Sequence, residues 1–286
     1  MNYSMRKGYI DRGLSSYQIK LIAVIFMTLG NLAAYGEEIE LVSDHSMILS
    51  ILGQISLPLF LYMLTESIHH TRNKQHFLFR LYFAAIGVGL LTTLSNIYTG
   101  DSVGFYRQDN IIFTYFYIAL YIISIERIIN GSQSHIKTET VFGTIGIITS
   151  IIAHLIVVFI RPALVDNIYS AAWFDSFIES PLYVEYTSIV IILGVLIYFL
   201  KEKWQKALVV CLFSFLSSSD MLEGFFISTP VSTFFNYPRH FMILGVPFML
   251  LYNGTRGKEN KSFFYLYYPI HRYCIALIAF TVNALV

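Results

Sequence analysis

The sequence predicts an all-α integral membrane bundle of about nine transmembrane helices with a cytoplasmic amino terminus. Of the 286 residues, 56% are hydrophobic and only 13% are charged. Nine apolar stretches are separated by loops in which basic residues are alternately crowded and nearly absent. A soluble domain of this composition could not cover its apolar surface with the polar residues that remain. We therefore expect a single membrane domain over residues 1–286.

A bilayer core about 30 Å thick requires roughly twenty helical residues for each crossing. Apolar stretches of about this length occur at residues 17–35, 47–66, 77–98, 111–130, 141–160, 184–200, 207–227, 235–253 and 263–284. The first stretch contains Asn31 and has no small-residue cleavage pattern, so we expect a retained span and not a signal peptide. Pro247 should kink the eighth.

The seventh stretch loses its apolar character at Ser217, Ser218, Ser219 and Asp220. A charged group inside a span is costly unless it faces protein or water. Either the helix is broken and faces a polar cavity, or it is short and the polar residues belong to the outer loop.

Basic residues lie mainly on one side of the predicted membrane. Of the 19 Lys and Arg, 14 fall in the amino terminus and the loops on its side, whereas Arg107, Arg161 and Arg239 lie on the other. Basic residues concentrate in cytoplasmic loops, so we expect a cytoplasmic amino terminus and an exterior carboxy terminus. The net charge of +1 argues against nucleic acid as a partner.

Lys20 and Asn31 stand eleven residues apart in the first span, on nearly the same helix face and about 16 Å apart along the axis. A cation at the cytoplasmic mouth with a buried amide beyond it suits an anionic ligand that enters from the cytosol. The alternative is that Lys20 is a surface anchor and that Asn31 joins two helices.

Glu66 and His70 share one helix face at the cytoplasmic end of the second span, where the carboxylate can orient the imidazole. The dipole at a helix carboxy terminus favours cations, which explains Arg72 and Lys74 but not Glu66. His69 and His70 are weak evidence for a metal, because no Cys, Asp or third His joins them at ligand spacing. We predict no metal site.

Three polar residues flank spans on the outer side. Asn110 precedes an apolar run and is explained by helix capping, or it contacts substrate. Arg239 and His240 open the eighth span, where they act as interfacial anchors or as further substrate contacts.

The most specific stretch begins with the basic turn Asn253-Gly254-Thr255-Arg256-Gly257. It continues through Lys261 to an aromatic helix start with Pro269 and His271. This order places cations beside a potential base on the cytosolic side. As structure alone, it is a turn followed by an aromatic belt.

Taken together, these motifs resemble the TraX family, named for the F-pilin acetylase, and through it the wider set of integral-membrane acyltransferases. The likeness covers nearly the whole chain. The matching residues are Lys20-Leu21-Ile22-Ala23 with Met27, Pro58-Leu59-Phe60 with Glu66, His70-Thr71-Arg72-Asn73, Asn110 with Phe113-Thr114, Tyr252-Asn253-Gly254, Arg256-Gly257, Tyr268-Pro269 and His271.

The resemblance implies a multi-pass protein of a bacterial inner membrane that transfers an acetyl or other acyl group from cytosolic acetyl-CoA to a peptide, glycan or lipid acceptor. One position departs from the family pattern: Gly30-Asn31 stands where the family typically has Asp-His. An amide nitrogen cannot take up a proton near neutral pH. Asn at this spacing from a basic residue is also similar to the heparan-α-glucosaminide acetyltransferase group.

Three functions follow from these patterns. In the first, an acyltransferase, His271 or His70 is the general base, Asn31 polarises the thioester and Glu66 assists. The residues expected to hold CoA are Lys20, Arg72, Asn253, Arg256 and Lys261. The second is a catalytically silent relative that serves as an assembly, immunity or sensor partner. The third is a small-solute transporter, favoured by the interrupted seventh span but not by any inverted repeat.

Overall fold

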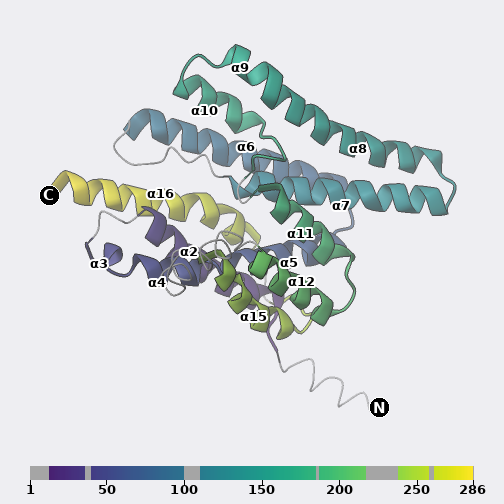
Figure 1. Cartoon of the computed structure of the whole chain (residues 1–286), viewed down its shortest axis with the longest axis horizontal. Coiled ribbons are helices and arrows are strands. Elements are labelled where there is room, and N and C mark those ends of the chain that lie inside the picture. Colours follow the sequence, from purple (N-terminus) through teal and green to yellow (C-terminus); the bar gives the residue numbers. More distant parts are fainter. Residues whose placement is uncertain are drawn as a thin grey trace, which may run out of the picture. The chain divides into compact units, whose positions relative to one another are not determined.

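The computed structural model describes residues 13–35, 40–99, 110–184, 187–216, 238–257 and 261–285. All regular elements within them are helical, apart from an isolated parallel bridge between Leu14 and Tyr252. This confirms the predicted all-α class. The α-helices are labelled in Figure 1. In chain order the elements are α2 (Ser16–Tyr35), α3 (Glu40–Ser43), α4 (Ser46–Gly53), α5 (Ser56–His69), α6 (Lys74–Thr99), α7 (Ile111–Gln133), α8 (Lys137–Leu155), the π-helix η2 (Ile156–Ile160), α9 (Arg161–Leu164), α10 (Ile168–Phe177), α11 (Thr187–Phe199), α12 (Lys203–Leu216), the 3₁₀ helix η3 (Pro238–Gly245), α15 (Val246–Leu250) and α16 (Lys261–Leu285).

The chain forms two compact units. Unit 1 comprises Met1–Met63 and Leu200–Val286, and unit 2 comprises Leu64–Phe199. In unit 1, α2 packs against α4 and α16, and η3 contacts α4, α12 and α15. In unit 2, α7 packs against α6, α8 and α11, and α10 packs on α6. The interpretation of residues 1–286 as one domain stays a prediction.

Among the described residues, five helices are long and apolar enough to cross a membrane: Ser16–Ala34, Ser46–His69, Lys74–Leu94, Ile111–Gln133 and Lys137–Leu164. They match the first five predicted spans and confirm the membrane character of the chain. The later stretches contain shorter apolar helices at Ser188–Phe199 and Arg239–Leu250, the 14-residue α12 and the 25-residue α16. The total of nine spans stays a prediction, and Ser217–Asp220 lie outside the described residues.

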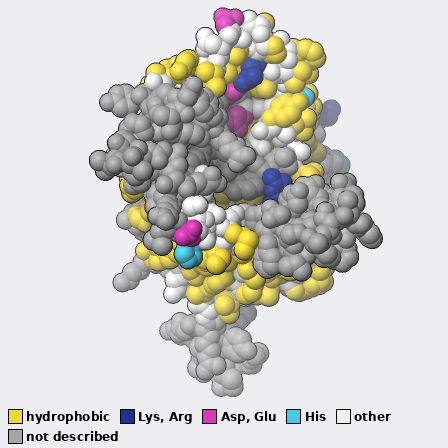
Figure 2. Space-filling view, turned by 60° about the vertical axis from the view of Figure 1, so that its left-hand side comes forward, with side chains coloured by type: hydrophobic (Ala, Val, Ile, Leu, Met, Phe, Trp, Pro, Cys, Tyr) yellow, Lys and Arg dark blue, Asp and Glu magenta, His cyan; other side chains and the backbone are white. Residues whose placement is uncertain are grey.

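Apolar side chains cover much of the described surface. They are exposed along the whole of α8, which presents Phe142, Ile145, Ile148 and Ile152, and Figure 2 shows broad apolar areas with few charged groups. Soluble proteins rarely expose patches of this size. A hydrocarbon environment removes the cost of exposing them.

Prolines account for two irregularities. The second predicted span is split into α4 and α5 at Gln54 and Ile55, because Pro58 has no N–H to donate to the carbonyl four residues earlier and its ring crowds that carbonyl. In the eighth, the expected interruption takes the form of a change from the 3₁₀ helix η3 to α15, which carries Pro247 in its first turn.

Helices α2 and α16 run in the same direction. Moving along α2, Tyr17 contacts Phe264, Thr28 contacts Tyr267 and Asn31 contacts His271, so the partners appear in the same order in both helices. If both helices cross the membrane, the number of spans from α2 to α16 is odd.

Helices α2 and α4 meet at two glycines. A Cβ atom added to Gly30 would lie 2.9 Å from the Cα of Gly53, and one added to Gly53 would lie 2.5 Å from the Cα of Gly30. Small residues of this kind let membrane helices approach closely. The contact fixes the depth of Asn31, the next residue along α2.

The first prediction concerns topology. Reporter domains fused after Val286 should report an exterior carboxy terminus, and fusions at residues 72–73 and 201–202, between helices, should report the cytoplasm, because 14 of the 19 basic residues lie on one predicted side. A cytoplasmic result at Val286 would contradict nine spans and imply an even number.

The second prediction concerns the glycine contact. Gly30→Ala and Gly53→Ala should each destabilise the protein by about 1–3 kcal/mol, since a methyl group at either site overpacks the helix contact. The matched control is Gly87→Ala in α6, where an added Cβ has nothing within 4 Å. This control should be neutral or stabilising by about 1 kcal/mol, because alanine is the better helix former. Thermal unfolding in detergent measures the difference, and equal stability of all three variants would refute the close contact.

Candidate functional site

His271 and Asn31 meet in the interior of unit 1. Asn31 Nδ2 lies 2.6 Å from His271 Nε2, and His271 Nδ1 lies 2.9 Å from the carbonyl oxygen of Tyr267, one helical turn earlier. The imidazole is 5% exposed. Two polar residues that the sequence marked separately, on the first and last predicted spans, therefore form one hydrogen-bonded pair.

These contacts define the tautomer of His271. A carbonyl oxygen can only accept, so Nδ1 carries the proton and Nε2 presents its lone pair to the Asn31 amide. If Nε2 became protonated, rotation of the amide by half a turn would present the Asn31 carbonyl oxygen to it. Asn31 can therefore form a hydrogen bond with either protonation state of the ring.

Tyr267 and Thr28 support this pair. The Tyr267 ring stacks on the imidazole with centroids 5.0 Å apart and planes 9° apart. The Thr28 hydroxyl donates to the carbonyl of Val24, so the Tyr267 hydroxyl, 2.8 Å away, donates to Thr28. Neither residue was predicted from the sequence. Their signal is the spacing of Tyr267 four residues before His271 and of Thr28 three residues before Asn31.

The basic turn after α15 holds the start of α2. Leu14 donates to the carbonyl of Leu251, and Asn253 donates to that of Leu14. The carbonyls of Thr255 and Arg256 accept from the first backbone N–H groups of α2, those of Ser16 and Tyr17, at 2.8 and 3.3 Å. We call residues 251–257 the clasp.

Two glycines and Asn253 give the clasp its shape. Gly254 and Gly257 have φ of +79° and +71°, a region that side chains disfavour. The Asn253 amide oxygen accepts from the backbone and hydroxyl of Thr255, and its nitrogen donates to Gly13. Asn253 therefore has a structural role, alongside the CoA contact predicted for it.

The start of α2 is fully hydrogen-bonded. Ser15 and Gln18 form a reciprocal capping pair, in which each side chain bonds the backbone N–H of the other. With Ser16 and Tyr17 bonded to the clasp, these N–H groups are not available to an anion. Any anionic ligand at this end must be bound by side chains.

Four basic side chains surround the clasp. Lys203 donates to the carbonyl of Tyr252, the Lys20 ammonium lies 5.9 Å from the centre of the Phe264 ring, and Arg256 is exposed on the clasp itself. Lys206 is only 4% exposed, and its ammonium lies 5.2 Å from the centre of the Tyr62 ring.

Lys206 was counted in the sequence only as a loop cation. Its position in the sequence could have indicated that it is buried, because it lies on the same face of α12 as the buried residues Ala207, Val210 and Ser214. A buried lysine is rare unless it has partners or a function.

Glu66, His70 and Arg72 belong to unit 2. The His70 N–H bonds the Glu66 carbonyl at 3.2 Å, which confirms the helical turn between them. Glu66 is half-buried, whereas His70 and Arg72 are exposed. Arg72 lines a cavity at the start of α6.

The three candidates predicted for the outer side differ in exposure. Asn110 is 3% exposed and caps α7 by accepting from Ile112, while its amide nitrogen donates to the carbonyl of Ala85. Capping, the structural explanation, is thereby confirmed. Arg239 is exposed and His240 half-buried, both on η3. Lys261 is the first residue of α16.

Within the described residues, no group of three His, Cys, Asp or Glu side chains is arranged to hold a metal. The arrangement in unit 1 offers instead a buried imidazole with a defined lone pair, an amide beside it and cations near the start of the same helix. These are the components of proton transfer near an anionic ligand.

The glycine contact also explains the departure at Gly30-Asn31. Because the Gly53 backbone lies against Gly30, an aspartate side chain at position 30 has no room in this packing.

A known protein family matches nearly the whole chain. The family model described as TraX protein matches residues 15–279, a range that includes both α2 and most of α16. No curated protein and no solved structure matches the chain. The chain therefore belongs to the TraX family.

Proposed function

We propose that this protein is a membrane-embedded acyltransferase that moves an acetyl group from cytosolic acetyl-CoA to a peptide, glycan or lipid acceptor at a bacterial inner membrane. The single observation that carries the proposal is the Asn31–His271 pair, in which a buried imidazole is held with Nε2 as its acceptor nitrogen. A general base requires this orientation.

His271 acts as the base. As the acceptor's amine or hydroxyl attacks the thioester carbonyl carbon, its proton passes to Nε2. The carbon–sulfur bond then breaks, and the CoA thiolate takes the proton from Nε2. Throughout, the bond from Nδ1 to the Tyr267 carbonyl keeps the ring oriented.

Asn31 has two tasks in this scheme. In the resting protein its amide occupies Nε2, so the incoming acceptor displaces it. The displaced NH₂ group then donates to the thioester oxygen, where negative charge develops in the transition state. An amide can donate this hydrogen bond without gaining or losing a proton. Asn31 can therefore stabilise the transition state, although it cannot act as a base as a histidine would.

The cations around the clasp hold the phosphates of CoA. Lys20 lies eleven residues before Asn31 on nearly the same face of α2, so the two ends of the site are about 16 Å apart. A donor with charged phosphates at one end and a thioester at the end of a long arm matches this separation. Arg256 and the buried Lys206 add to the positive charge on the same side of unit 1.

A catalytically silent relative is the second candidate, and one observation favours it. The Asn31 amide already satisfies the Nε2 lone pair, as expected if the pair served only to join α2 to α16. Turnover of labelled acetyl-CoA separates the two functions.

The third prediction tests the base. His271→Ala should lower acetyl transfer at least about a hundredfold, the usual contribution of a general base, while CoA binding persists. His45→Ala is the matched control, because it removes an exposed imidazole of the same unit that does not belong to this pair. Transfer is measured with labelled acetyl-CoA and membrane acceptors, with folding checked by thermal unfolding. Wild-type transfer by folded His271→Ala would exclude His271 as the base, and no transfer by the wild type would favour the silent relative.

The fourth prediction tests the donor site. Arg256→Ala should raise the KM for acetyl-CoA about five- to tenfold, the value of one charged hydrogen bond, with kcat little changed. The control is Arg80→Ala, which removes the same charge from an exposed position of α6. The difference in KM between Arg256→Ala and the wild type should become smaller as the salt concentration is raised. An equal effect of both variants would show that the charge acts only at long range.

A further inference from the structure

A second polar site lies wholly within unit 2. A cavity of about 370 Å³ opens beside the first turn of α6 and the end of α7. Three cations line it, Arg72, Lys74 and Arg127, against the single carboxylate of Glu126. Its volume is in the range of small-ligand sites.

The carboxylate is already fully used. One oxygen of Glu126 pairs with the Lys74 ammonium, and the other accepts from the Tyr198 hydroxyl. Lys74 also donates to that hydroxyl at 3.3 Å, which closes a triangle. The Tyr198 ring is fixed in turn by stacking on His69, with centroids 3.9 Å apart. This triangle neutralises Glu126 and holds the ammonium of Lys74 in place.

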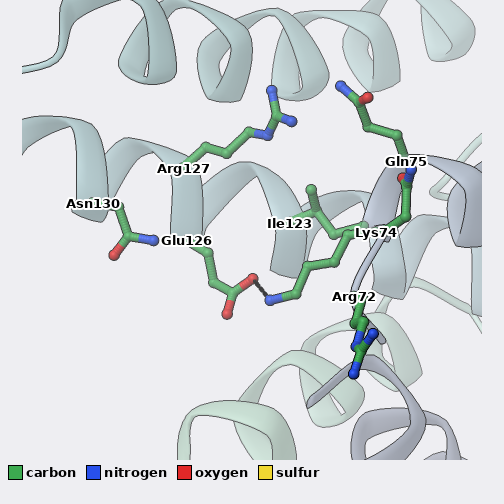
Figure 3. A pocket seen from close by; sticks show the side chains of 8 residues that line it. Arg72, Lys74, Gln75, Ile123, Glu126, Arg127 and Asn130 are labelled. Atoms are coloured by element: carbon green, nitrogen blue, oxygen red, sulfur yellow. Dashed lines mark hydrogen bonds and ion pairs between the residues drawn. The ribbon is translucent and has the colours of Figure 1, made fainter. Parts of the chain in front are cut away.

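The two arginines lie on either side of this ion pair. Figure 3 shows Arg127 and Gln75 extending on one side of the Lys74–Glu126 pair and Arg72 on the other. Arg127 is restrained by Glu139, with 3.7 Å between Nε and the carboxylate, and by the Phe142 ring at 5.5 Å. No ion pair joins Arg72 to any residue in the described part of the chain.

The start of α6 adds to the positive potential. Asn73 caps the helix by accepting from the His76 N–H at 3.0 Å. Among the described residues, nothing accepts from the backbone N–H groups of Lys74 and Gln75, and the positive end of the helix dipole favours an anion there. The cavity and its three cations, however, are the primary observation.

We propose that this cavity binds a phosphate group. Phosphate oxygens point in several directions and can accept from the fixed Lys74 ammonium and from a guanidinium beside it, whereas a planar carboxylate offers two oxygens in one plane. The phosphate belongs either to the headgroup of an anionic phospholipid or to a soluble ligand. The site goes beyond the proposed acyl transfer, because it uses residues of unit 2 alone.

The test uses the purified full-length protein and two probes. Native mass spectrometry compares retention of phosphatidylglycerol with that of phosphatidylcholine, and calorimetry measures binding of inorganic pyrophosphate. The variants are Arg127→Gln and Arg72→Gln, and the matched control is Arg80→Gln, at an exposed position of α6 outside the cavity. Lys74 is not substituted, because its removal would leave the Glu126 carboxylate without its cationic partner.

We expect the site to lose affinity about tenfold in Arg127→Gln or Arg72→Gln, as for one charged hydrogen bond, and to keep it in Arg80→Gln. If phosphatidylglycerol shows this pattern, the ligand is a lipid headgroup. If pyrophosphate shows it, the ligand is a soluble phosphate compound. If neither probe binds preferentially, or if Arg80→Gln weakens binding as much as the cavity variants, the cations are only membrane anchors and the proposal is overturned.

Discussion

The position of helix α2 is the constraint on which unit 1 depends. The helix is held at its start by the clasp, whose carbonyls accept from Ser16 and Tyr17, and near its end by the contact of Gly30 with Gly53. With both ends held, α2 cannot shift by one helical turn along its axis relative to α4 and the clasp. Asn31 therefore reaches His271 at a fixed depth, and the cations near the clasp stand at a fixed distance from that pair.

This constraint changes how the basic turn is interpreted. Its sequence pattern, glycines and a cation before an aromatic helix, suggested a surface that binds phosphate directly. In the structure, Gly254, Gly257 and Asn253 shape the turn so that its backbone carbonyls accept from α2, whereas the exposed side chain of Arg256 is available to a ligand. Structural and binding roles are thus divided between neighbouring residues of one motif.

The sequence was sufficient for the elements that depend on local pattern. Apolar length alone located the first five spans, and the cap at Asn110 followed from a polar residue before an apolar run. The remaining features depend on partners distant in the chain. Nothing near Gly30 indicates that it meets Gly53, and Lys206 reads as an ordinary loop cation until α12 is placed with that face inward. Asn31 and His271 were marked individually, but their pairing required the direction of α16 relative to α2.

The clasp also has a consequence for biogenesis. Helix α2 is made first, yet the carbonyls that accept from its first turn belong to residues 251–257, which leave the ribosome near the end of synthesis. Unit 2 is one continuous segment that ends at Phe199. Because domains are generally completed in the order in which their residues are made, unit 2 matures while unit 1 is still open. The earliest membrane helix is therefore among the last to be finished, and a chain truncated before residue 251 carries a complete unit 2 beside an unclosed first helix.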